Sequence, residues 1–542
     1  MKITTKIAAS IMTLSAILNT ACTDSWDDHY AGTVSSSNLW EAISSYSDLS
    51  NFKHVIEGCG YDKNLAGSQT FSVFAPNNST LSASQADSLI NAYNTQKNAG
   101  IKDDQNTVIK QFIQNHISPF THTVSSLTNE QVTMMNGKYQ TLTGNAIDNI
   151  SLLTKNDMYC NGVLYTIGDK INYFPNIYEY LGLDNEVDSV YNFIKSHNEY
   201  ELNKSASVAG SIVNGETVYL DSVMNVHNEL YSSLGYINSE DSSYIMVVPT
   251  NSEWARLTNE YKKYFNYDKS VNKRDSLQNV FSRLAILWGT AFNRTDNTDA
   301  ALQDSAVAVN AYSYEMRTSL NTDPYYVFYK PYTNIFANTQ SVTCSNGTVM
   351  KKADWNIDIH NTFAQKINVE ATSLSNQDTI IYAEDPLTVR QVSISNPFYD
   401  KIMNNSFVEV IPENTSVNPE VSFSISNVLS NLPYDVYVVF APAIAYDTLA
   451  AAEDRLPCRI QATLSWNDAN GKLKTQKSGN LTTKEDEVDS LLVFENITIP
   501  TCSYGLSNQV KINITSRVAS TATSKYTRTM RIACIIFKPH EE

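Results

Sequence analysis

Two short motifs each occur twice in this chain, in the same order and at similar spacing. The first motif is an apolar stretch that ends in proline and polar residues, FSVFAPNN and later IMVVPTNS. The second is an Asn-Gly turn that leads into further apolar residues, CNGVLYTIGD and later CSNGTV. The interval from Pro76 to Asn161 is 85 residues, and that from Pro249 to Asn346 is 97. Two copies of one fold, the second with an insertion, explain this spacing.

The first copy has the periodicity of a mixed α/β domain. Apolar residues recur at three- and four-residue intervals over residues 39–56 and 108–117, which predicts two amphipathic helices. The apolar run before Pro76 predicts a strand, and Asn77 or Asn78 is expected to cap the helix that follows. The Asn136-Gly137 pair between apolar runs predicts a hairpin.

These motifs carry a family resemblance. The order DLSNF, TFSVFAPNN, NHI and CNGVLYTIGD over residues 37–183 resembles a fasciclin domain. The family has a Tyr-His pair after its third helix, which is implicated in adhesion in animal members. Here the pair is Asn115-His116, so the histidine is present and the tyrosine is not. We therefore expect His116 to be a hydrogen-bonded core histidine rather than part of an adhesion site.

Residues 184–389 resemble a second, more divergent fasciclin domain. Its insertion is expected near residues 291–340, and Asn214-Gly215 is expected to turn a hairpin. Leu284–Trp288 stands where the third helix and its pair would lie, and it contains no histidine.

After residue 390 the pattern changes to short strands with polar turns. Seven such strands predict an antiparallel β-sandwich over residues 390–542. Trp466 precedes an Asn-Gly turn, where it could present a flat surface to a ligand, although burial in the core is the more common fate of a tryptophan. The expected strands are Phe407–Ile411, Val421–Ile425, Val436–Phe440, Arg459–Trp466, Leu491–Ile499, Val510–Ile514 and Met530–Phe537.

The first residues resemble the signal of a bacterial lipoprotein. Residues 1–21 have two lysines and then an apolar run of twelve residues, Ile7–Leu18, which is too short to span a bilayer as a helix. Small residues before Cys22 resemble a lipobox, although the preferred leucine is displaced by one position. The resemblance implies cleavage before Cys22 and a diacylglycerol on its thiol, with two acyl chains enough for stable anchoring. Three aspartates in the expected tether, residues 22–36, resemble the surface-export signal of Bacteroidota lipoproteins.

Charge and cysteine content restrict the classes of partner. Without residues 1–21 the chain has 37 Lys and Arg against 56 Asp and Glu, a formal charge of −19, which argues against nucleic acid as a partner. Six cysteines remain after Cys22 without any CxxC pair, which argues against a zinc ribbon. Most of them are expected to be buried thiols.

No catalytic or metal-binding motif is recognisable in the chain. HExxH, GxSxG, Walker and GxGxxG motifs do not occur, and no two histidines share a helix face. We therefore expect no catalytic residues, no cofactor and no metal.

The expected function is that of a surface-exposed, outer-membrane, lipid-anchored binding protein. Similar lipoproteins occur beside TonB-dependent importers of the Sus type, which implies a transporter and its lid lipoprotein as partners and a glycan or peptide as ligand. Two alternatives are a stand-alone adhesin and, less favoured, a hydrolase whose site is assembled from distant residues.

Overall fold

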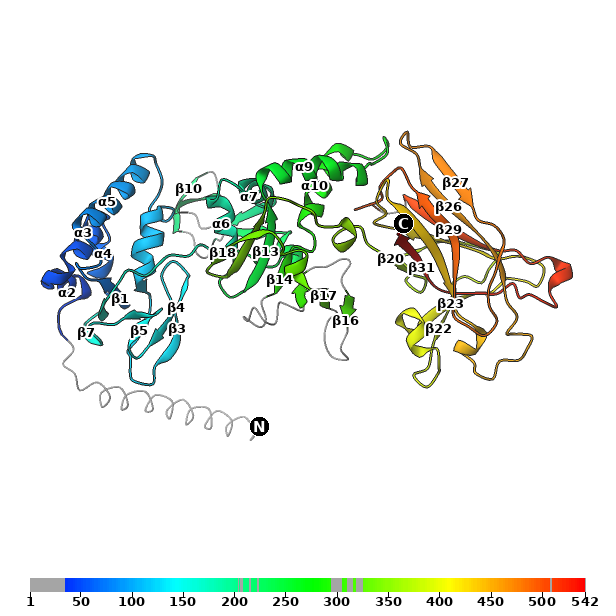
Figure 1. Ribbon diagram of the computed structural model, residues 1–542, viewed down its shortest axis with the longest axis horizontal. Coiled ribbons are helices and arrows are strands. Elements are labelled where there is room, and N and C mark those ends of the chain that lie inside the picture. The colour runs from blue at the N-terminus through cyan, green and yellow to red at the C-terminus, as the bar shows by residue number, and fades with distance from the viewer. Residues whose placement is uncertain are drawn as a thin grey trace, which may run out of the picture. The chain divides into compact units, whose positions relative to one another are not determined.

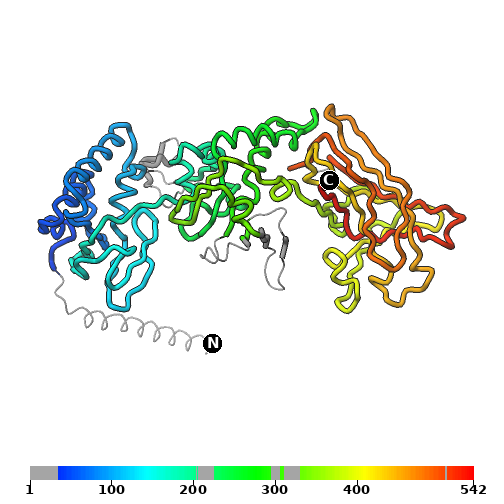
Figure 2. Tube along the Cα trace, viewed as in Figure 1, coloured from blue at the N-terminus to red at the C-terminus, as the bar shows by residue number. Residues whose placement is uncertain are grey.

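The computed structural model of this chain describes residues 35–202, 204, 208–213, 216–221, 224–293, 305–309, 315–317, 325–506 and 509–541 (Figure 2). The expected signal peptide, Cys22 and the Asn214-Gly215 turn lie outside the described residues. The chain divides into two compact units, Met1–Pro175 and Asn176–Glu542. No helix in the described part of the chain combines the length and apolarity that a bilayer-spanning segment needs.

The first unit combines helices with two small sheets (Figure 1). Its elements are α2 (Leu39–Ser45), η1 (Ser47–Leu49), α3 (Ser50–Gly58), α4 (Asp62–Leu65), β1 (Phe71–Pro76), α5 (Ala83–Asn98), η2 (Ile109–Ile113), η3 (Gln114–His116), β2 (Ile117–Ser118), β3 (Asn129–Thr133), β4 (Tyr139–Thr143), β5 (Ala146–Ile147), β6 (Ile150–Ser151), β7 (Asp157–Tyr159) and β8 (Gly162–Ile167).

The central strands of the first unit are the two motif strands of the sequence. The main sheet has the order β2-β1-β8-β7, and β1 pairs with β8 in parallel. All six residues of each of these two strands are buried, as expected for parallel strands that are covered on both faces. The predicted hairpin at Asn136-Gly137 joins β3 to β4 in the second sheet.

The helix after β1 begins later than predicted. Ser82, not Asn77 or Asn78, caps α5, in a reciprocal capping box with Gln85. Asn77 instead accepts hydrogen bonds within its own turn, from the backbone and side chain of Ser79. Polar side chains that stabilise a turn of their own compete with helix capping, which is why the expected cap was displaced.

The second unit begins with the same architecture. Its first elements are α6 (Ile177–Leu183), α7 (Asp188–Lys195), β9 (Asn198–Leu202), β10 (Val208–Val213), β11 (Glu216–Asp221), β12 (Met224–Asn228), α8 (Tyr231–Leu234), β13 (Tyr244–Pro249), α9 (Asn251–Tyr261), η4 (Lys262–Tyr264), α10 (Arg274–Leu287), β14 (Ala291–Asn293), β15 (Ser305–Ala308), β16 (Glu315–Arg317), β17 (Tyr325–Tyr329), η5 (Pro331–Thr333), β18 (Thr339–Cys344) and β19 (Gly347–Lys352).

Strand pairing shows that this part of the chain repeats the first unit. The segment β14-β13-β19-β18 of its sheet corresponds to β2-β1-β8-β7, with β13 and β19 again parallel. Asn78 and Asn251 follow the two equivalent prolines. Each accepts a hydrogen bond from a helix N–H, that of Asn51 or of Ser189, at 3.0 Å. The register of β14 places Thr290 where the first copy has His116, so the expected absence of a histidine is confirmed.

The additions to the second copy lie in two places. Strands β15, β17 and β16 extend its sheet beyond β14, within the expected insertion near residues 291–340. A further addition, β9 to β12, separates α7 from α8, and its strands β10 and β11 flank residues 214–215, where the sequence predicted a hairpin. It forms two antiparallel pairs, β12 with β9 and β10 with β11.

The boundaries of the parts differ from those expected at residues 183 and 389. Residues 176–183 belong to the second unit, because Asn176 caps α6 as Asn38 caps α2 and because Ile177 and Leu181 join the core of the second unit. At the other end, β20 (Ile367–Glu370) and β21 (Gln377–Ile381) pair with strands of the C-terminal sheets.

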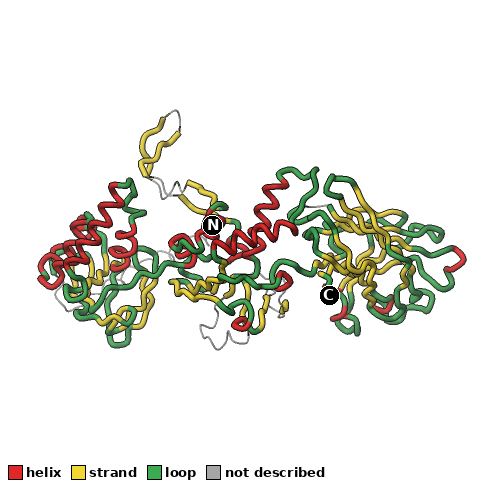
Figure 3. Tube along the Cα trace, turned by 45° about the horizontal axis from the view of Figure 1, so that its top comes forward, coloured by secondary structure: helices red, strands yellow, loops and turns green. Residues whose placement is uncertain are grey.

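The C-terminal part consists of two six-stranded antiparallel sheets (Figure 3). Their orders are β22-β23-β31-β25-β29, with β20 beside β31, and β21-β24-β30-β26-β27, with β28 beside β26. All seven predicted strands are present. The remaining elements are β22 (Thr388–Gln391), η7 (Tyr399–Lys401), η8 (Met403–Asn405), β23 (Ser406–Val410), β24 (Glu420–Ile425), β25 (Pro433–Phe440), η9 (Ala443–Ala445), β26 (Arg459–Asn467), β27 (Leu473–Lys477), β28 (Leu481–Thr482), β29 (Asp489–Thr498), β30 (Val510–Ser516), η10 (Ser520–Ala522) and β31 (Met530–Pro539).

Partly buried hydrogen bonds join the second copy to these sheets. The Asn266 N–H donates to the hydroxyl of Ser430 at 2.8 Å, and that hydroxyl donates to the Lys263 carbonyl at 2.8 Å. The Tyr267 hydroxyl donates to the Tyr504 carbonyl at 2.9 Å. Aromatic rings pack around this junction, which makes the two parts of the second unit share one core.

Candidate functional site

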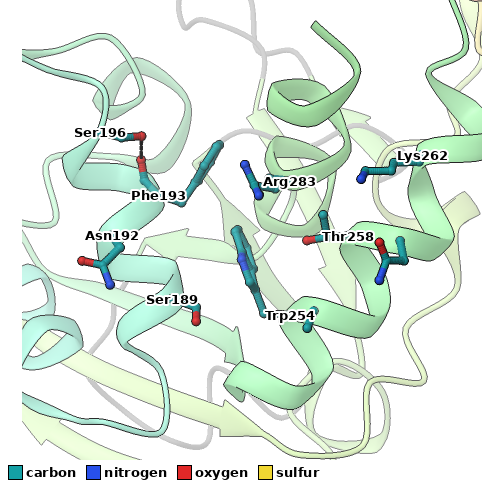
Figure 4. Close-up of a pocket in the computed structure, with 10 residues that line it drawn as sticks. Ser189, Asn192, Phe193, Ser196, Trp254, Thr258, Lys262 and Arg283 are labelled. Atoms are coloured by element: carbon teal, nitrogen blue, oxygen red, sulfur yellow. Dashed lines mark hydrogen bonds between the residues drawn. The ribbon is translucent and has the colours of Figure 1, made fainter. Parts of the chain in front are cut away.

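A pocket of about 580 Å³ opens in the second copy, between α7, α9 with its extension into η4, and α10 (Figure 4). Its volume lies within the range of small-molecule sites. The ten residues that line it are Ser189, Asn192, Phe193, Ser196, Trp254, Ala255, Thr258, Asn259, Lys262 and Arg283.

The aromatic part of the pocket comes from two helices. Phe193 of α7 and Trp254 of α9 pack with ring centroids 5.5 Å apart and planes inclined by 52°. Both side chains are largely buried, and both belong to the core of the second unit. The pair therefore provides a rigid apolar surface that both helices hold in place.

Two cations of the pocket have no counter-ion among the described residues. Among the described residues, neither the Lys262 ammonium nor the Arg283 guanidinium forms an ion pair or a hydrogen bond, and none of the ten lining residues is acidic. Arg256, on the same helix as Trp254, differs: it pairs with Glu253 at 2.7 Å and with Glu260 at 2.6 Å. The positive charge of the pocket is therefore available to a ligand.

A third polar group of the pocket is buried without a partner. Thr258 is 7% exposed, and its hydroxyl makes no hydrogen bond to any described group. Figure 4 shows this hydroxyl, the Arg283 guanidinium and the Lys262 ammonium extending towards Phe193 and Trp254. An unpaired buried hydroxyl is costly, so a ligand atom that bonds to it gains binding energy.

The first copy carries different chemistry at the equivalent position. Leu81 matches Trp254, because its N–H bonds to the Asn77 carbonyl at 2.9 Å as that of Trp254 bonds to Thr250 at 2.8 Å. The depression around Leu81 is lined mainly by apolar and uncharged side chains, with Lys170 as its one cation. A pocket with two cations is thus found in the second copy and not at the equivalent position of the first.

Helix packing explains part of this difference. At the end of α3, Gly58 lies so close to α5 that an added Cβ would be 2.7 Å from Ile90 Cδ1. Asn51 and Ser189 are equivalent, since their N–H groups make the same hydrogen bond in the two copies. Ser196 follows Ser189 at the same interval as Gly58 follows Asn51, so Ser196 is the equivalent of Gly58. A side chain in place of Gly58 would therefore meet Ile90, whereas Ser196 lines the pocket of the second copy.

His116 lies in the core of the first copy, as expected. Its side chain is fully buried, with Nδ1 bonded to the Phe112 carbonyl at 2.7 Å and Nε2 accepting from the Ile171 N–H at 3.0 Å. Burial lowers the pKa of His116 to about 4. Because the His116 imidazole is neutral, fully buried and hydrogen-bonded through both nitrogens, it cannot contact a partner protein.

Trp466 lies apart from the pocket lining. It lies on the same face of β26 as the buried residues Ile460, Ala462 and Leu464, and it packs against the core of the second unit. Its use as a ligand platform stays a prediction. Among the described cysteines, Cys160 is exposed and five are buried, as was expected for most of them: Cys59, Cys344, Cys458, Cys502 and Cys534.

Sequence reasoning missed the pocket residues Thr258, Lys262 and Arg283. Lysines and arginines on helices usually lie in water, and nothing in their spacing distinguishes these two.

In the described ranges, no group of three or more His, Cys, Asp or Glu side chains could hold a metal ion.

Comparisons with known proteins identify part of the chain. Residues 47–171 match the fasciclin domain family. No curated protein matches the chain. Among solved structures, a fasciclin domain pair from the insect cell adhesion molecule fasciclin I is 12% identical, with a TM-score of 0.18, covering 56% of this chain and 94% of that one. The C-terminal family 22 carbohydrate-binding module of Clostridium thermocellum Xyn10B is 10% identical, with a TM-score of 0.20, covering 32% of this chain and 92% of that one.

The match to residues 47–171 agrees with the motifs, the strand order and the buried histidine of the first unit. Residues 47–171 of the first unit therefore belong to the fasciclin domain family.

Proposed function

We propose that this chain is a surface-exposed lipoprotein of the outer membrane that acts as a non-catalytic binding component of a TonB-dependent, Sus-type importer for glycans or peptides. Cys22 would carry the lipid, and the acidic segment after it would hold the folded parts away from the anionic membrane surface. Two fasciclin-like domains and a C-terminal β-sandwich would form the part outside the membrane.

The pocket of the second copy is the observation that supports a binding role. It combines an aromatic pair, two cations without counter-ions and an unpaired buried hydroxyl, a set that fixes the orientation of a ligand. Its ten lining residues include no histidine, carboxylate or thiol, which are common general bases and nucleophiles in enzymes. The pocket therefore favours binding over turnover.

Affinity purification from detergent-solubilised outer membranes tests the importer proposal. A C-terminally tagged full-length chain is isolated and its partners are identified by mass spectrometry. Stoichiometric recovery of a TonB-dependent transporter and its lid lipoprotein is the expected result. Recovery of the tagged protein alone would contradict the proposal and favour the stand-alone adhesin.

Protease treatment of intact cells tests the location separately. A surface lipoprotein should be degraded by added proteinase K, whereas a periplasmic protein should remain intact until the outer membrane is opened. A Cys22→Ser variant should lose its membrane attachment, because the thiol that would carry the lipid is gone. Survival of the chain on intact cells would contradict surface exposure.

A further inference from the structure

We propose that the pocket between α7, α9 and α10 binds an acidic sugar residue, with its carboxylate between Lys262 and Arg283 and its ring against Phe193 and Trp254. This inference rests on the proposed binding function and names the class of its ligand. It identifies the ligand by charge, shape and hydrogen bonding, each of which a separate observation supports.

The charge of the pocket favours an anion. Lys262 and Arg283 extend into it without a described counter-ion, in a chain whose formal net charge is −17. Elsewhere in the second unit, the largely buried Lys351 is neutralised by Asp184 at 2.9 Å and by Glu186 at 2.6 Å. A guanidinium binds a carboxylate through two parallel hydrogen bonds, and a neighbouring ammonium adds a third donor.

The lining of the pocket favours a ligand that is larger than a simple anion. The aromatic pair offers an apolar surface that an inorganic ion cannot use, and the volume of about 580 Å³ is far larger than such an ion needs. A pyranose ring has C–H faces that pack on aromatic side chains and hydroxyls around its edge. Uncharged polar side chains that could bond to these hydroxyls line the pocket, from α7 and from α9: Ser189, Asn192, Ser196 and Asn259.

Thr258 supplies the observation that is independent of charge. Its hydroxyl is buried, unpartnered among the described groups and directed into the pocket. A ring hydroxyl or a carboxylate oxygen would complete its hydrogen bonding. Among the described residues, Thr258 Oγ1 is one of three buried side-chain atoms without a hydrogen-bond partner, and it is the one of the three that lines this pocket.

Isothermal titration of the full chain lacking residues 1–21 tests the proposal. The probes are oligogalacturonate, oligoglucuronate and oligomannuronate, the methyl ester of each, and inorganic phosphate. At least one uronate should bind, and its methyl ester, which has the same ring without the charge, should bind at least about tenfold more weakly. Binding of the acid should weaken as salt is raised, because the cations are partly exposed.

Substitutions connect the binding to the pocket. Arg283→Gln and Lys262→Gln should each weaken uronate binding at least about tenfold. Lys263→Gln is the matched control, since this neighbouring lysine is exposed and its ammonium lies 4.8 Å from the Tyr264 ring centroid, outside the pocket lining. It removes the same charge and should leave the affinity unchanged. Thermal unfolding of each variant verifies that the second unit is folded.

Three results would overturn the proposal: no binding of any uronate, equal binding of a uronate and its methyl ester, or phosphate binding as tightly as the uronate. An equal loss from Lys263→Gln and Arg283→Gln would also overturn it, because general attraction would then explain the affinity. Affinity purification with the tagged Arg283→Gln chain distinguishes the two proposals. Recovery of the transporter would support the importer role whether or not the pocket binds a uronate.

Discussion

Asn161 and Asn346 make the same three hydrogen bonds in the two copies of the fold. The Asn161 side-chain oxygen accepts the Leu39 N–H at 2.8 Å, and its amide group donates to the carbonyls of Leu65 and Gly67, each at 2.8 Å. The Asn346 oxygen accepts the Ile177 N–H at 2.8 Å. Each asparagine thus joins the first helix of its copy to the loop before the first central strand.

The Asn346 amide group donates the two remaining hydrogen bonds of the set, to the Ile237 carbonyl at 2.8 Å and to the Ser239 carbonyl at 2.9 Å.

Replacing either asparagine by alanine leaves one N–H and two carbonyls without this partner. We expect Asn161→Ala to lower the free energy of unfolding of the first unit by about 3 kcal/mol, from three hydrogen bonds of about 1 kcal/mol each. Urea denaturation measures this, with Asn346→Ala acting on the second unit. A loss below about 1 kcal/mol would contradict the shared structural role.

The glycine that follows each of these asparagines cannot be replaced. An added Cβ at Gly162 would be 1.9 Å from the Phe71 carbonyl oxygen, and the backbone there has φ +144°. We expect Gly162→Ala to cost at least about 3 kcal/mol, because two central strands would have to separate. Gly479→Ala is the control, since nothing lies within 4 Å of an added Cβ there. Melting temperatures measure both, and similar values for the two variants would refute the explanation.

His116 should make the stability of the first unit depend on pH. Burial lowers its pKa from 6.5 to about 4. The unfolded chain therefore takes up a proton near pH 6.5 while the folded chain does not, so stability is complete above pH 6.5 and declines as the pH falls towards 4. Protonation of His116 in the unfolded chain should therefore lower the free energy of unfolding of the first unit by about 3 kcal/mol between pH 7 and pH 4. Urea denaturation at pH 7 and pH 4 should show a smaller loss for His116→Gln than for the unmodified chain, and equal losses would be inconsistent with this assignment.

Thr258 should reduce stability in the absence of a ligand. Its hydroxyl is buried without a described partner, so Thr258→Val should raise the free energy of unfolding of the second unit by about 1 kcal/mol. Thr290→Val is the matched control, because the buried Thr290 hydroxyl donates to the Leu287 carbonyl at 2.7 Å, and its loss should destabilise the unit. Chemical denaturation without ligand measures both. A destabilised Thr258→Val chain would show that the hydroxyl already has a partner.

Periodicity in the sequence predicted most of the regular structure. The seven C-terminal strands, the two central motif strands of the first copy and the hairpin at Asn136-Gly137 are all present. Boundaries were less predictable, as residues 176–183 show. Their helical pattern is equally compatible with the end of the first unit and the start of the second, and only the packing of Ile177 and Leu181 distinguishes the two.

The sequence by itself determined the duplication, the fasciclin resemblance and the identity of the strands, because local periodicity and turn residues act over a few neighbouring positions. Only the tertiary structure decided where the pocket lies. Its aromatic pair, cations and hydroxyl come from separate helices, α7, α9 with η4, and α10, and α7 precedes the other helices by more than fifty residues. Whether Thr258 is buried or Arg283 is paired depends on how these helices pack, and packing is a property of the whole fold.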